Sequence, residues 1–401
     1  MKSKNSINML KKITSLLLFL VLFSCSSNSD DSYEDVPSYP FVESEFGSSI
    51  DLNNLANYAN QTVPTYITKN NSQGSIITDK GATLGRVLFY DKKLSSNNTI
   101  SCSSCHIQAN AFGDVAVASQ GVNGTTGRHS MRLINVRFAN EAKFFWDERA
   151  INLETQTTMP IKDHGEMGYS GQNGDQSFSD LIVKLNAVGY YRELFKFVYG
   201  TEEITETKIQ TALSQFVRSI QSFDSKYDIG RALAPNDGAQ FANFTAQEND
   251  GKNLFLTPPT FNASGVRTSG GLGCAGCHRA PEFDIDPNTG NNGIIGTISG
   301  TGIDITNTKA PTLRNLVKLD GTTNGPMMHT GVITSLQQAI GHYGTINRAP
   351  GNTNLDPRLT PGGVGQQLNL TNTEVNAVVA FLRTLSGSDV YTNPKWSNPF
   401  N

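Results

Sequence analysis

Apolar side chains recur at spacings of three and four residues in two stretches that lie far apart in the chain. The first stretch covers residues 209–220 and the second covers residues 375–385. This spacing places the apolar side chains on one face of a helix, so each stretch predicts an amphipathic helix with a buried side. Thr205 stands at the start of the first helix, and Thr371 and Glu374 stand at the start of the second, where such residues cap the first turn.

A second pattern indicates that the chain repeats itself. Residues 85–89 (Gly-Arg-Val-Leu-Phe) stand shortly before a Cys-x-x-Cys-His motif, and residues 251–255 (Gly-Lys-Asn-Leu-Phe) stand shortly before another. Loops and one of the two predicted helices follow each motif. This order resembles the c-type cytochrome fold, present twice. We therefore predict a mainly α protein of two tandem haem domains, residues 51–233 and 234–401, divided in the polar stretch 234–238. Long glycine-rich loops argue against an extended sheet.

The chain opens with several lysines followed by a short apolar run, residues 13–23. This order is typical of a secretory signal. We predict that residues 1–24 are a lipoprotein signal peptide and that Cys25 is lipidated. Residues 25–50 are expected to form a flexible tether, because the stretch is rich in serine, aspartate and proline. Phe23 is an unusual residue for this kind of cleavage site, so an uncleaved anchor is the rival interpretation.

A lipid on Cys25 would hold the protein at the membrane of the cell envelope, on the periplasmic side. We expect the outer membrane, and the acidic residues after Cys25 leave display at the cell surface open. The formal net charge is −3 and charged residues are 17% of the chain. Nucleic acid is therefore not an expected partner, because it binds proteins with a basic excess. Beyond the N-terminal run, no apolar stretch approaches the ~20 residues that span a bilayer.

Four of the five cysteines lie in the two Cys-x-x-Cys-His motifs. The motifs are Cys102, Cys105 and His106, and Cys274, Cys277 and His278. Two thiols at this spacing can add to the two vinyl groups of a haem, and the adjacent histidine can then bind the iron from the proximal side. One motif alone would also fit a redox dithiol or half of a zinc site. Two copies, each followed by histidine, favour two covalently bound haem c groups.

Longer motifs follow each of these segments. They are residues 144–150 (Phe-Phe-Trp-Asp-Glu-Arg-Ala), 153–156 (Leu-Glu-Thr-Gln), 160–168 (Pro-Ile-Lys-Asp-His-Gly-Glu-Met-Gly), 311–315 (Pro-Thr-Leu-Arg-Asn) and 329–331 (His-Thr-Gly). Together they resemble the bacterial di-haem cytochrome c peroxidase family, over roughly residues 80–388. MauG-type enzymes, which oxidise residues of a partner protein, belong to the same superfamily.

The resemblance implies that the two haems have different roles. The N-terminal haem reacts with hydrogen peroxide, and the C-terminal haem accepts electrons from a small donor, a cytochrome c or a cupredoxin. Glu166 matches the family's catalytic glutamate and Gln156 its distal glutamine. A carboxylate in a partly desolvated pocket has a raised pKa, which suits proton transfer near neutral pH. Trp146 is either a core aromatic or an electron path between the haems, and both roles are compatible.

The distal side of the first haem has two interpretations. Family members that need reductive activation carry a histidine that plugs this side, but the corresponding stretch, residues 116–127, contains no histidine. His129 lies just beyond it. Either His129 is a displaced plug, or the peroxidatic iron is already open, which we favour. The family often has a calcium-binding asparagine at the position of His129. The expected calcium site is therefore weakened, and the backbone oxygens of Asn324 and Pro326 are its candidate ligands.

The distal ligand of the second haem also has more than one candidate. Tyr343 stands where many family members have a methionine, which is similar to the MauG type. An anionic oxygen ligand would stabilise ferric iron relative to methionine. His342, Met327 and Met328 are rival ligands, and Tyr343 would then merely pack. His164 lies in the predicted catalytic loop and is expected to be a structural histidine rather than a ligand.

Three functions of different classes fit these features. The leading one is a peroxidase that reduces hydrogen peroxide with electrons from a small periplasmic protein. The second is a MauG-like oxidase that modifies a tyrosine or tryptophan of a partner protein. The third is a non-catalytic di-haem electron carrier, in which both irons are closed. A homodimer is common in the family and is left open.

Overall fold

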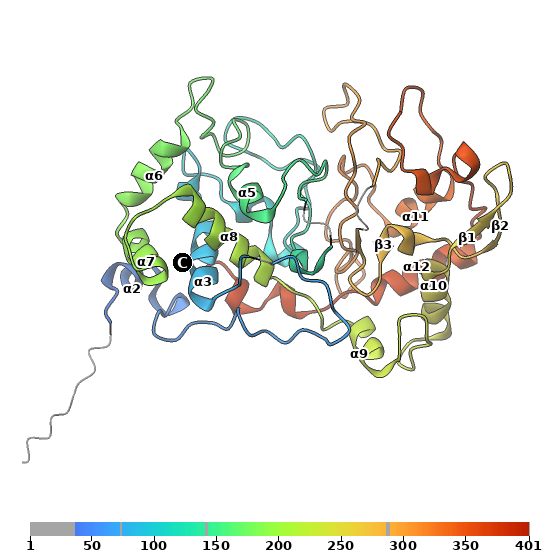
Figure 1. Ribbon diagram of the computed structural model, residues 1–401, viewed down its shortest axis with the longest axis horizontal. Helices are drawn as coiled ribbons and strands as arrows, with labels where there is room; N and C mark the ends of the chain where they lie inside the picture. The colour runs from blue at the N-terminus through green and yellow to red at the C-terminus, as the bar shows by residue number, and fades with distance from the viewer. Residues whose placement is uncertain (1–36, 73, 141–142, 286–288, 401) are drawn as a thin grey trace, which may run out of the picture. The chain divides into compact units, whose positions relative to one another are not determined.

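Helices dominate the computed structural model, as the spacing of apolar residues predicts. The structure describes residues 37–72, 74–140, 143–285 and 289–400. The predicted signal peptide and the lipidated Cys25 lie outside these residues. The described α-helices are α2 (Pro40–Phe46), α3 (Asp79–Tyr90), α4 (Cys102–Cys105), α5 (Leu153–Thr158), α6 (Phe178–Asn186), α7 (Gly189–Tyr199), α8 (Glu206–Ser219), α9 (Lys226–Leu233), α10 (Ala246–Leu256), α11 (Leu336–Gly344) and α12 (Asn372–Arg383) (Figure 1). The mainly α prediction is confirmed.

Short 3₁₀ turns connect many of the helices. They are η1 (Gly47–Ser49), η2 (Lys92–Leu94), η3 (Gln108–Asn110), η4 (Val136–Phe138), η5 (Cys274–Gly276), η6 (Pro357–Leu359), η7 (Pro361–Gly363), η8 (Asp389–Tyr391) and η9 (Pro394–Trp396). Within the described part of the chain, no helix combines the length and the apolar character that crossing a membrane requires.

The two helices predicted from apolar spacing are both present and begin where expected. α8 follows Thr205, whose hydroxyl accepts a hydrogen bond from the backbone of Lys208 at 3.3 Å. α12 follows Thr371, whose hydroxyl accepts from the backbone of Glu374 at 3.2 Å, while the Glu374 carboxylate accepts from the backbone of Thr371. Such caps satisfy backbone donors that the first turn leaves free, and each contributes about 1 kcal/mol.

Each of these helices packs against the helix that precedes a Cys-x-x-Cys-His motif. α3 packs on α8, and α10 packs on α12 (Figure 1). Gly85 of α3 lies so close to Ala212 and Phe216 of α8 that a Cβ atom would overlap them. Gly251 of α10 makes the same approach to Ala377 and Phe381 of α12. The glycines are therefore required by close helix packing, and the internal repeat is present in three dimensions.

Only short strands occur in the described residues. β1 (Pro259–Phe261) pairs antiparallel with β2 (Arg267–Gly270), and β3 (His278–Arg279) pairs antiparallel with β4 (Asp284–Ile285). The first pair forms a short hairpin within one of the long glycine-rich loops. Asn262 supports its turn, because the side-chain oxygen accepts hydrogen bonds from the backbone of Ser264 and Val266, both at 3.0 Å.

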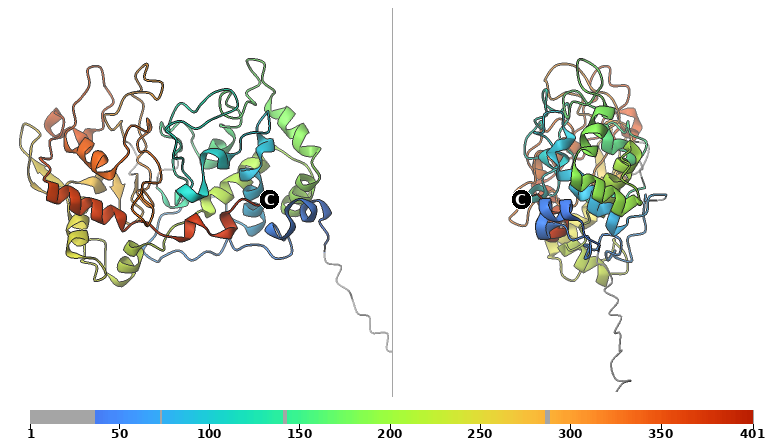
Figure 2. Two further views of the ribbon diagram at one scale, coloured as in Figure 1. Left: turned by 180° about the vertical axis from the view of Figure 1, so that it is seen from behind. Right: turned by 90° about the vertical axis from the view of Figure 1, so that its left-hand side faces the viewer.

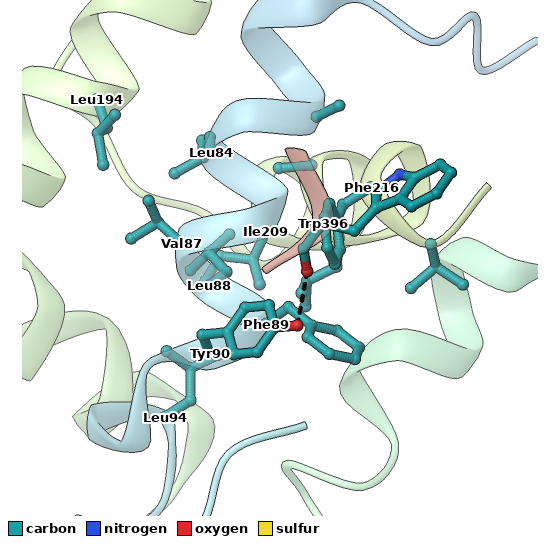
Figure 3. Packing of buried hydrophobic residues seen from close by; sticks show 14 of the residues in the cluster. Leu84, Val87, Leu88, Phe89, Tyr90, Leu94, Leu194, Ile209, Phe216 and Trp396 are labelled. Carbon is teal, nitrogen blue, oxygen red and sulfur yellow. Dashed lines mark hydrogen bonds between the residues drawn. The ribbon is translucent and has the colours of Figure 1, made fainter. Parts of the chain in front are cut away.

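Two hydrophobic clusters form the interior of the unit Tyr39–Asn401. The first contains α3, α7 and α8, and the second contains α10 and α12. The C-terminal segment belongs to the first cluster: Trp396 is fully buried there, and its backbone oxygen accepts a 2.6 Å hydrogen bond from the hydroxyl of Tyr90 (Figures 2 and 3). Residues from both sides of the predicted boundary at 234–238 therefore build the first cluster.

The predicted tether is wrong at its C-terminal end. Residues 40–46 form α2, in which Val42 and Phe46 are buried in the first cluster. Phe46 contacts the rings of Tyr190 and Phe400 edge to face, with centroids 5.2 and 5.0 Å apart. The prediction missed this helix because the segment is mostly polar and because the residues that bury Val42 and Phe46 lie far away in the sequence.

Candidate functional site

The first Cys-x-x-Cys-His motif forms a short helix, α4, which begins after Ser101. Serine suits this N-cap position, where the backbone is extended. The ring Nδ1 of His106 lies 3.1 Å from the backbone oxygen of Phe112, so Nδ1 carries the hydrogen and Nε2 is left to bind a metal. Burial lowers the pKa of His106, and the carbonyls of Phe112 and Met131 oppose that shift only in part. The imidazole is therefore neutral at physiological pH.

The second motif also carries a buried histidine, but on a different local structure. η5 (Cys274–Gly276) supplies the turn, and His278 opens β3. Burial lowers the pKa of His278 to about 4, against the opposing effect of the carbonyls of Phe283 and Pro311. This imidazole is also neutral, which is the form that binds iron.

Three of the four cysteine thiols of the motifs, those of Cys102, Cys105 and Cys274, are poor redox nucleophiles. None of them forms a disulfide in the structure. Burial raises the pKa of Cys102 and of Cys274 to about 12, and that of Cys105 to about 11. A reactive dithiol needs a lowered pKa, because only the thiolate attacks. The environment therefore disfavours the dithiol alternative and suits thiols that become permanently bonded to a carbon group.

A cavity of about 610 Å³, here called the first cavity, opens beside the first motif. This volume lies within the range of about 300–1,000 Å³ that is usual for ligand sites. Apolar side chains such as Leu133, Phe144 and Leu213 form much of its lining. The predicted site residues that line it are Cys102, Cys105, His106, His129, Trp146, Gln156 and Glu166. The thiols, the proximal imidazole and the apolar wall that would hold a haem at this motif therefore lie in one cavity.

Glu166 has the electrostatic character expected of a catalytic acid–base group. Its backbone N–H donates to Asp163 Oδ1 at 3.0 Å, and its backbone oxygen accepts from Val122 at 3.0 Å. These bonds fix the loop that carries it. Burial raises the pKa of Glu166 to about 7; the charge of Asp163 adds to the rise and that of Arg149 opposes it. The carboxyl group can therefore both accept and release a proton near neutral pH.

Gln156 reaches the first cavity from α5. Asn152 caps this helix, with its side-chain oxygen accepting from the backbone of Thr155 at 2.8 Å. α5 packs against α8, and Glu154 of α5 forms an ion pair with Arg218 of α8. The N-terminal turn of the helix is thus held in place, and Gln156 and Glu166 line the same cavity.

A cavity of about 220 Å³, the second cavity, lies beside the second motif and is lined by Cys274, Cys277 and His278. Its lining is also largely apolar, with Phe255, Leu316 and Leu382 among its members. The donor set matches that of the first cavity, so the residues fit a second haem of the same type. The smaller volume indicates that side chains fill more of this site.

Tyr343 and Met328, the two ligand types predicted for the second haem, both line the second cavity. Asn292 holds them together: its side-chain amide lies 3.2 Å from Met328 Sδ and 3.4 Å from the Tyr343 hydroxyl. His342 is not part of the lining, and its Nε2 lies 2.9 Å from the backbone oxygen of Asn292. Burial raises the pKa of Tyr343. The structure therefore brings three of the candidate ligands, Tyr343, Met327 and Met328, to the cavity and leaves His342 engaged with the backbone.

Eight residues line both cavities and are here called the shared wall. They are His129, Ser130, Met131, Arg132, Trp146, Lys309, Ala310 and Pro311. Trp146 is tied to both sides of this wall: its Nε1 donates to the backbone oxygen of His129, and its own backbone oxygen accepts from Lys309, each at 2.7 Å. The indole therefore belongs to the wall that the two cavities share, and its role as an electron path stays a prediction.

His129 lies in the shared wall rather than over the first cavity alone. Its Nδ1 is 3.0 Å from the backbone oxygen of Ala116, and burial lowers its pKa, so the ring is neutral. His164, in contrast, is half exposed and lies 2.8 Å from Asp175. This position fits the structural role predicted for His164.

The side chains of the two residues predicted as calcium ligands have different surroundings. Pro326 lines the second cavity. Asn324 is buried, and its side-chain amide donates to the backbone of Asn315 and to the Tyr391 hydroxyl at 2.8 and 2.7 Å. Among the described residues, no cluster of three or more His, Cys, Asp or Glu side chains is arranged to hold a metal ion. The calcium site stays a prediction based on backbone oxygens.

Several charged residues of the site were not predicted from sequence. Arg149, Asp147, Arg128 and Asp304 form a chain of ion pairs with distances of 2.8, 3.0 and 2.7 Å. The two arginines and Asp304 also line the first cavity. Their charges were visible in the sequence, but the pairing with Asp304 joins segments far apart in the chain. The sequence around Asn292 likewise gave no indication that this residue lies beside the candidate ligands of the second cavity.

The chain was compared with known proteins. The di-haem cytochrome c peroxidase family model matches residues 79–233. The cytochrome c551 peroxidase of Nitrosomonas europaea is 29% identical over 319 residues, covering 76% of this chain and 80% of that protein. MauG of Methylophilus methylotrophus, a methylamine utilization protein, is 26% identical, covering 78% of this chain and 84% of that protein.

The crystal structure of a MauG-like protein associated with microbial copper homeostasis superposes with a TM-score of 0.63 at 27% identity. The match covers 85% of this chain and 99% of that one. Residues 79–233 therefore match the di-haem cytochrome c peroxidase family, and the curated relatives of the chain include both cytochrome c peroxidases and MauG proteins.

Proposed function

We propose that the protein is a peroxidase that reduces hydrogen peroxide to water with electrons from a small periplasmic donor, a cytochrome c or a cupredoxin. The observation that carries the proposal is that Glu166 and Gln156 line the same cavity as the first Cys-x-x-Cys-His motif. The reaction takes up two electrons and two protons for each peroxide and releases two water molecules. It therefore needs a proton-transfer group beside the site at which the peroxide is reduced.

Glu166 meets this need. With a pKa raised to about 7, its carboxylate can take the proton of one peroxide oxygen and deliver it to the other. Gln156 can hydrogen-bond peroxide through its amide, which both donates and accepts. A haem held by Cys102, Cys105 and His106 would supply the iron at which the electrons reach the peroxide.

The experiment is steady-state turnover of hydrogen peroxide by the purified di-haem protein, with reduced cytochrome c as the donor. Turnover without prior reduction is expected, because we propose that the first iron is open. A high-spin ferric signal in the wild-type spectrum supports that openness. Absence of turnover both before and after reduction would overturn the peroxidase proposal.

A second candidate function is that of a MauG-like oxidase, which oxidises a tyrosine or tryptophan of a partner protein. The position of Tyr343 in the second cavity favours it. Such an enzyme consumes peroxide without oxidising reduced cytochrome c at a matching rate. Turnover of peroxide that needs a protein substrate, with cross-linked or hydroxylated products found by mass spectrometry, would support this function over the first.

A non-catalytic electron carrier is the third candidate and makes the opposite prediction about Glu166. In a carrier, both irons are six-coordinate and Glu166→Gln has no effect on electron transfer. The raised pKa of Glu166 argues against a carrier, because a solvated surface carboxyl would keep an ordinary pKa.

The same proposal includes two covalent haem c groups, one on each motif, in two tandem domains that divide near residues 234–238. Mass spectrometry of the purified chain is expected to show the mass of two haems, and Cys105→Ala or Cys277→Ala is expected to remove one haem-binding site each. A bound Ca²⁺ at the backbone oxygens of Asn324 and Pro326 is a further expectation. Elemental analysis before and after chelator treatment tests it.

Localisation also belongs to the proposal. Lipidation of Cys25 would anchor the protein to the cell envelope on the periplasmic side, at the outer membrane or displayed from it. Cys25→Ala is expected to release the protein into the soluble fraction after cell fractionation. Size-exclusion chromatography with light scattering tests whether the protein is a homodimer.

A further inference from the structure

Arg132 carries a positive charge into the shared wall between the two cavities. Its side chain lines both cavities. Burial lowers its pKa to about 10, so the guanidinium stays charged at physiological pH while lying in a poorly solvated place. Burying a charge costs several kcal/mol unless a partner of opposite charge offsets it.

Arg132 has no such partner within the described residues. One of its terminal nitrogens, Nη2, donates to the backbone oxygen of Thr312 at 3.2 Å, and this carbonyl is neutral. Its Nε is buried and has no hydrogen-bond partner. Two acidic residues of the lining are engaged elsewhere: Asp304 pairs with Arg128, and Asp284 pairs with Lys69. Several guanidinium donors therefore have no protein acceptor.

The internal repeat contains a residue at the position equivalent to Arg132. The backbone N–H of Leu133 donates to Phe112, and that of Leu313 donates to Phe283, at equivalent points of the two repeats. Leu133 follows Arg132, and Leu313 follows Thr312. Thr312 is thus the counterpart of Arg132, so the second repeat builds the same backbone with a small neutral residue.

We propose that Arg132 is an anion-binding residue and that its ligand is a propionate carboxylate of a haem bound in one or both cavities. Haem is the carboxylate-bearing group that the two motifs fit, and a guanidinium binds a carboxylate through two parallel hydrogen bonds. This inference rests on the proposed occupancy of the motifs by haem. It does not depend on which reaction the haems perform.

The proposal is tested on the di-haem protein with two neutral variants, Arg132→Thr and Arg132→Gln. Threonine copies the counterpart in the second repeat, and glutamine fills more of the space of arginine. Resonance Raman spectra report the propionate bending mode, which depends on hydrogen bonds to the propionate. We expect this band to shift in both variants. We also expect at least one haem midpoint potential to fall in a spectroelectrochemical titration, because a nearby cation favours the reduced iron.

Arg132→Lys keeps the charge and is expected to retain a potential close to that of the wild type. Arg192→Thr is the matched control, because Arg192 is a half-exposed arginine outside the lining of both cavities. An unchanged propionate band in both neutral variants, at full haem content, would overturn the proposal, even if a potential falls. That result would leave Arg132 as a remote charge that does not touch the ligand. Failure of the peroxidase function would appear separately, as a lack of turnover by the wild type.

Discussion

The indole Nε1 of Trp146 donates a 2.7 Å hydrogen bond to the backbone oxygen of His129, and both residues line the two cavities. This bond holds the indole in one orientation within the shared wall. The backbone N–H of Lys309 reinforces that position by donating to the backbone oxygen of Trp146 at 2.7 Å. A rigid aromatic group thus stands between the two sites at which the motifs would place haems.

Replacing Trp146 with phenylalanine is expected to slow electron transfer between the haems. The variant lacks the donor to the buried oxygen of His129, so the free energy of unfolding should fall by about 1–3 kcal/mol. Stopped-flow oxidation of the fully reduced protein by peroxide measures the transfer rate. Trp396→Phe is the control, because Trp396 is buried in the first cluster and lines neither cavity. Equal transfer rates in the two variants would count against a role of Trp146 in the path.

Glu166→Gln is expected to lower the peroxidase kcat by about 10²–10⁴-fold, which is the usual contribution of a general acid–base group. The variant should still bind both haems, because Glu166 is not one of the residues that attach a haem. Steady-state turnover and the haem spectrum are measured on the same sample. Glu202→Gln, at an exposed carboxylate, should leave kcat unchanged. A Glu166→Gln variant with wild-type turnover would contradict the assignment.

The pH profile of turnover provides a sharper check of the same residue. If the ionised carboxylate takes the first proton, the rate rises as the pH increases through about 7, the raised pKa of Glu166. Asp163→Asn removes a negative charge that raises this pKa, so its profile should move to lower pH. Arg149→Gln removes a positive charge that lowers it, so its profile should move to higher pH. Shifts in the same direction in both variants would exclude this electrostatic account.

Two variants decide between the rival ligands in the second cavity. Tyr343→Phe is expected to change the ferric spectrum and to raise the midpoint potential of the second haem, because an anionic oxygen ligand stabilises ferric iron. Met328→Leu is then expected to leave both unchanged. Absorption spectroscopy during a redox titration measures both quantities. The reverse pattern would assign Met328 as the ligand and Tyr343 as a packing residue.

The close helix contacts predict an effect on stability. Gly85→Ala and Gly251→Ala would each place a Cβ against the backbone of the partner helix, and such overpacking costs about 1–3 kcal/mol. Gly341→Ala in α11 meets no atom within 4 Å and should instead be neutral or stabilise by up to about 1 kcal/mol, because alanine favours helix. Thermal unfolding of the three variants measures the difference. Similar melting temperatures for Gly85→Ala and Gly341→Ala would contradict the packing argument.

The sequence was sufficient to predict features that depend only on residues close together in the chain. These are the Cys-x-x-Cys-His motifs, the helices at residues 209–220 and 375–385, and the threonine caps of these helices. Helix periodicity and capping are properties of one local segment, so the pattern of side chains is sufficient to predict them. The identity of Glu166 and Gln156 as site residues came from longer motifs, and the structure then brought both into the first cavity.

Other features depend on partners that the sequence does not place. α2 was missed because its anchors, Val42 and Phe46, become buried only against side chains such as Tyr190 and Phe400. The pairing of Arg128 with Asp304 likewise joins distant segments.

The paired Cys-x-x-Cys-His motifs, with their histidines and their repeated helices, were thus determined by the sequence alone, because covalent attachment and helix formation need only near neighbours. Which residues form the shared wall, in contrast, was determined only by the tertiary structure. The burial of Trp146 and Arg132 and the hydrogen bonds that they donate depend on which segments meet there, and only long-range packing brings those segments together.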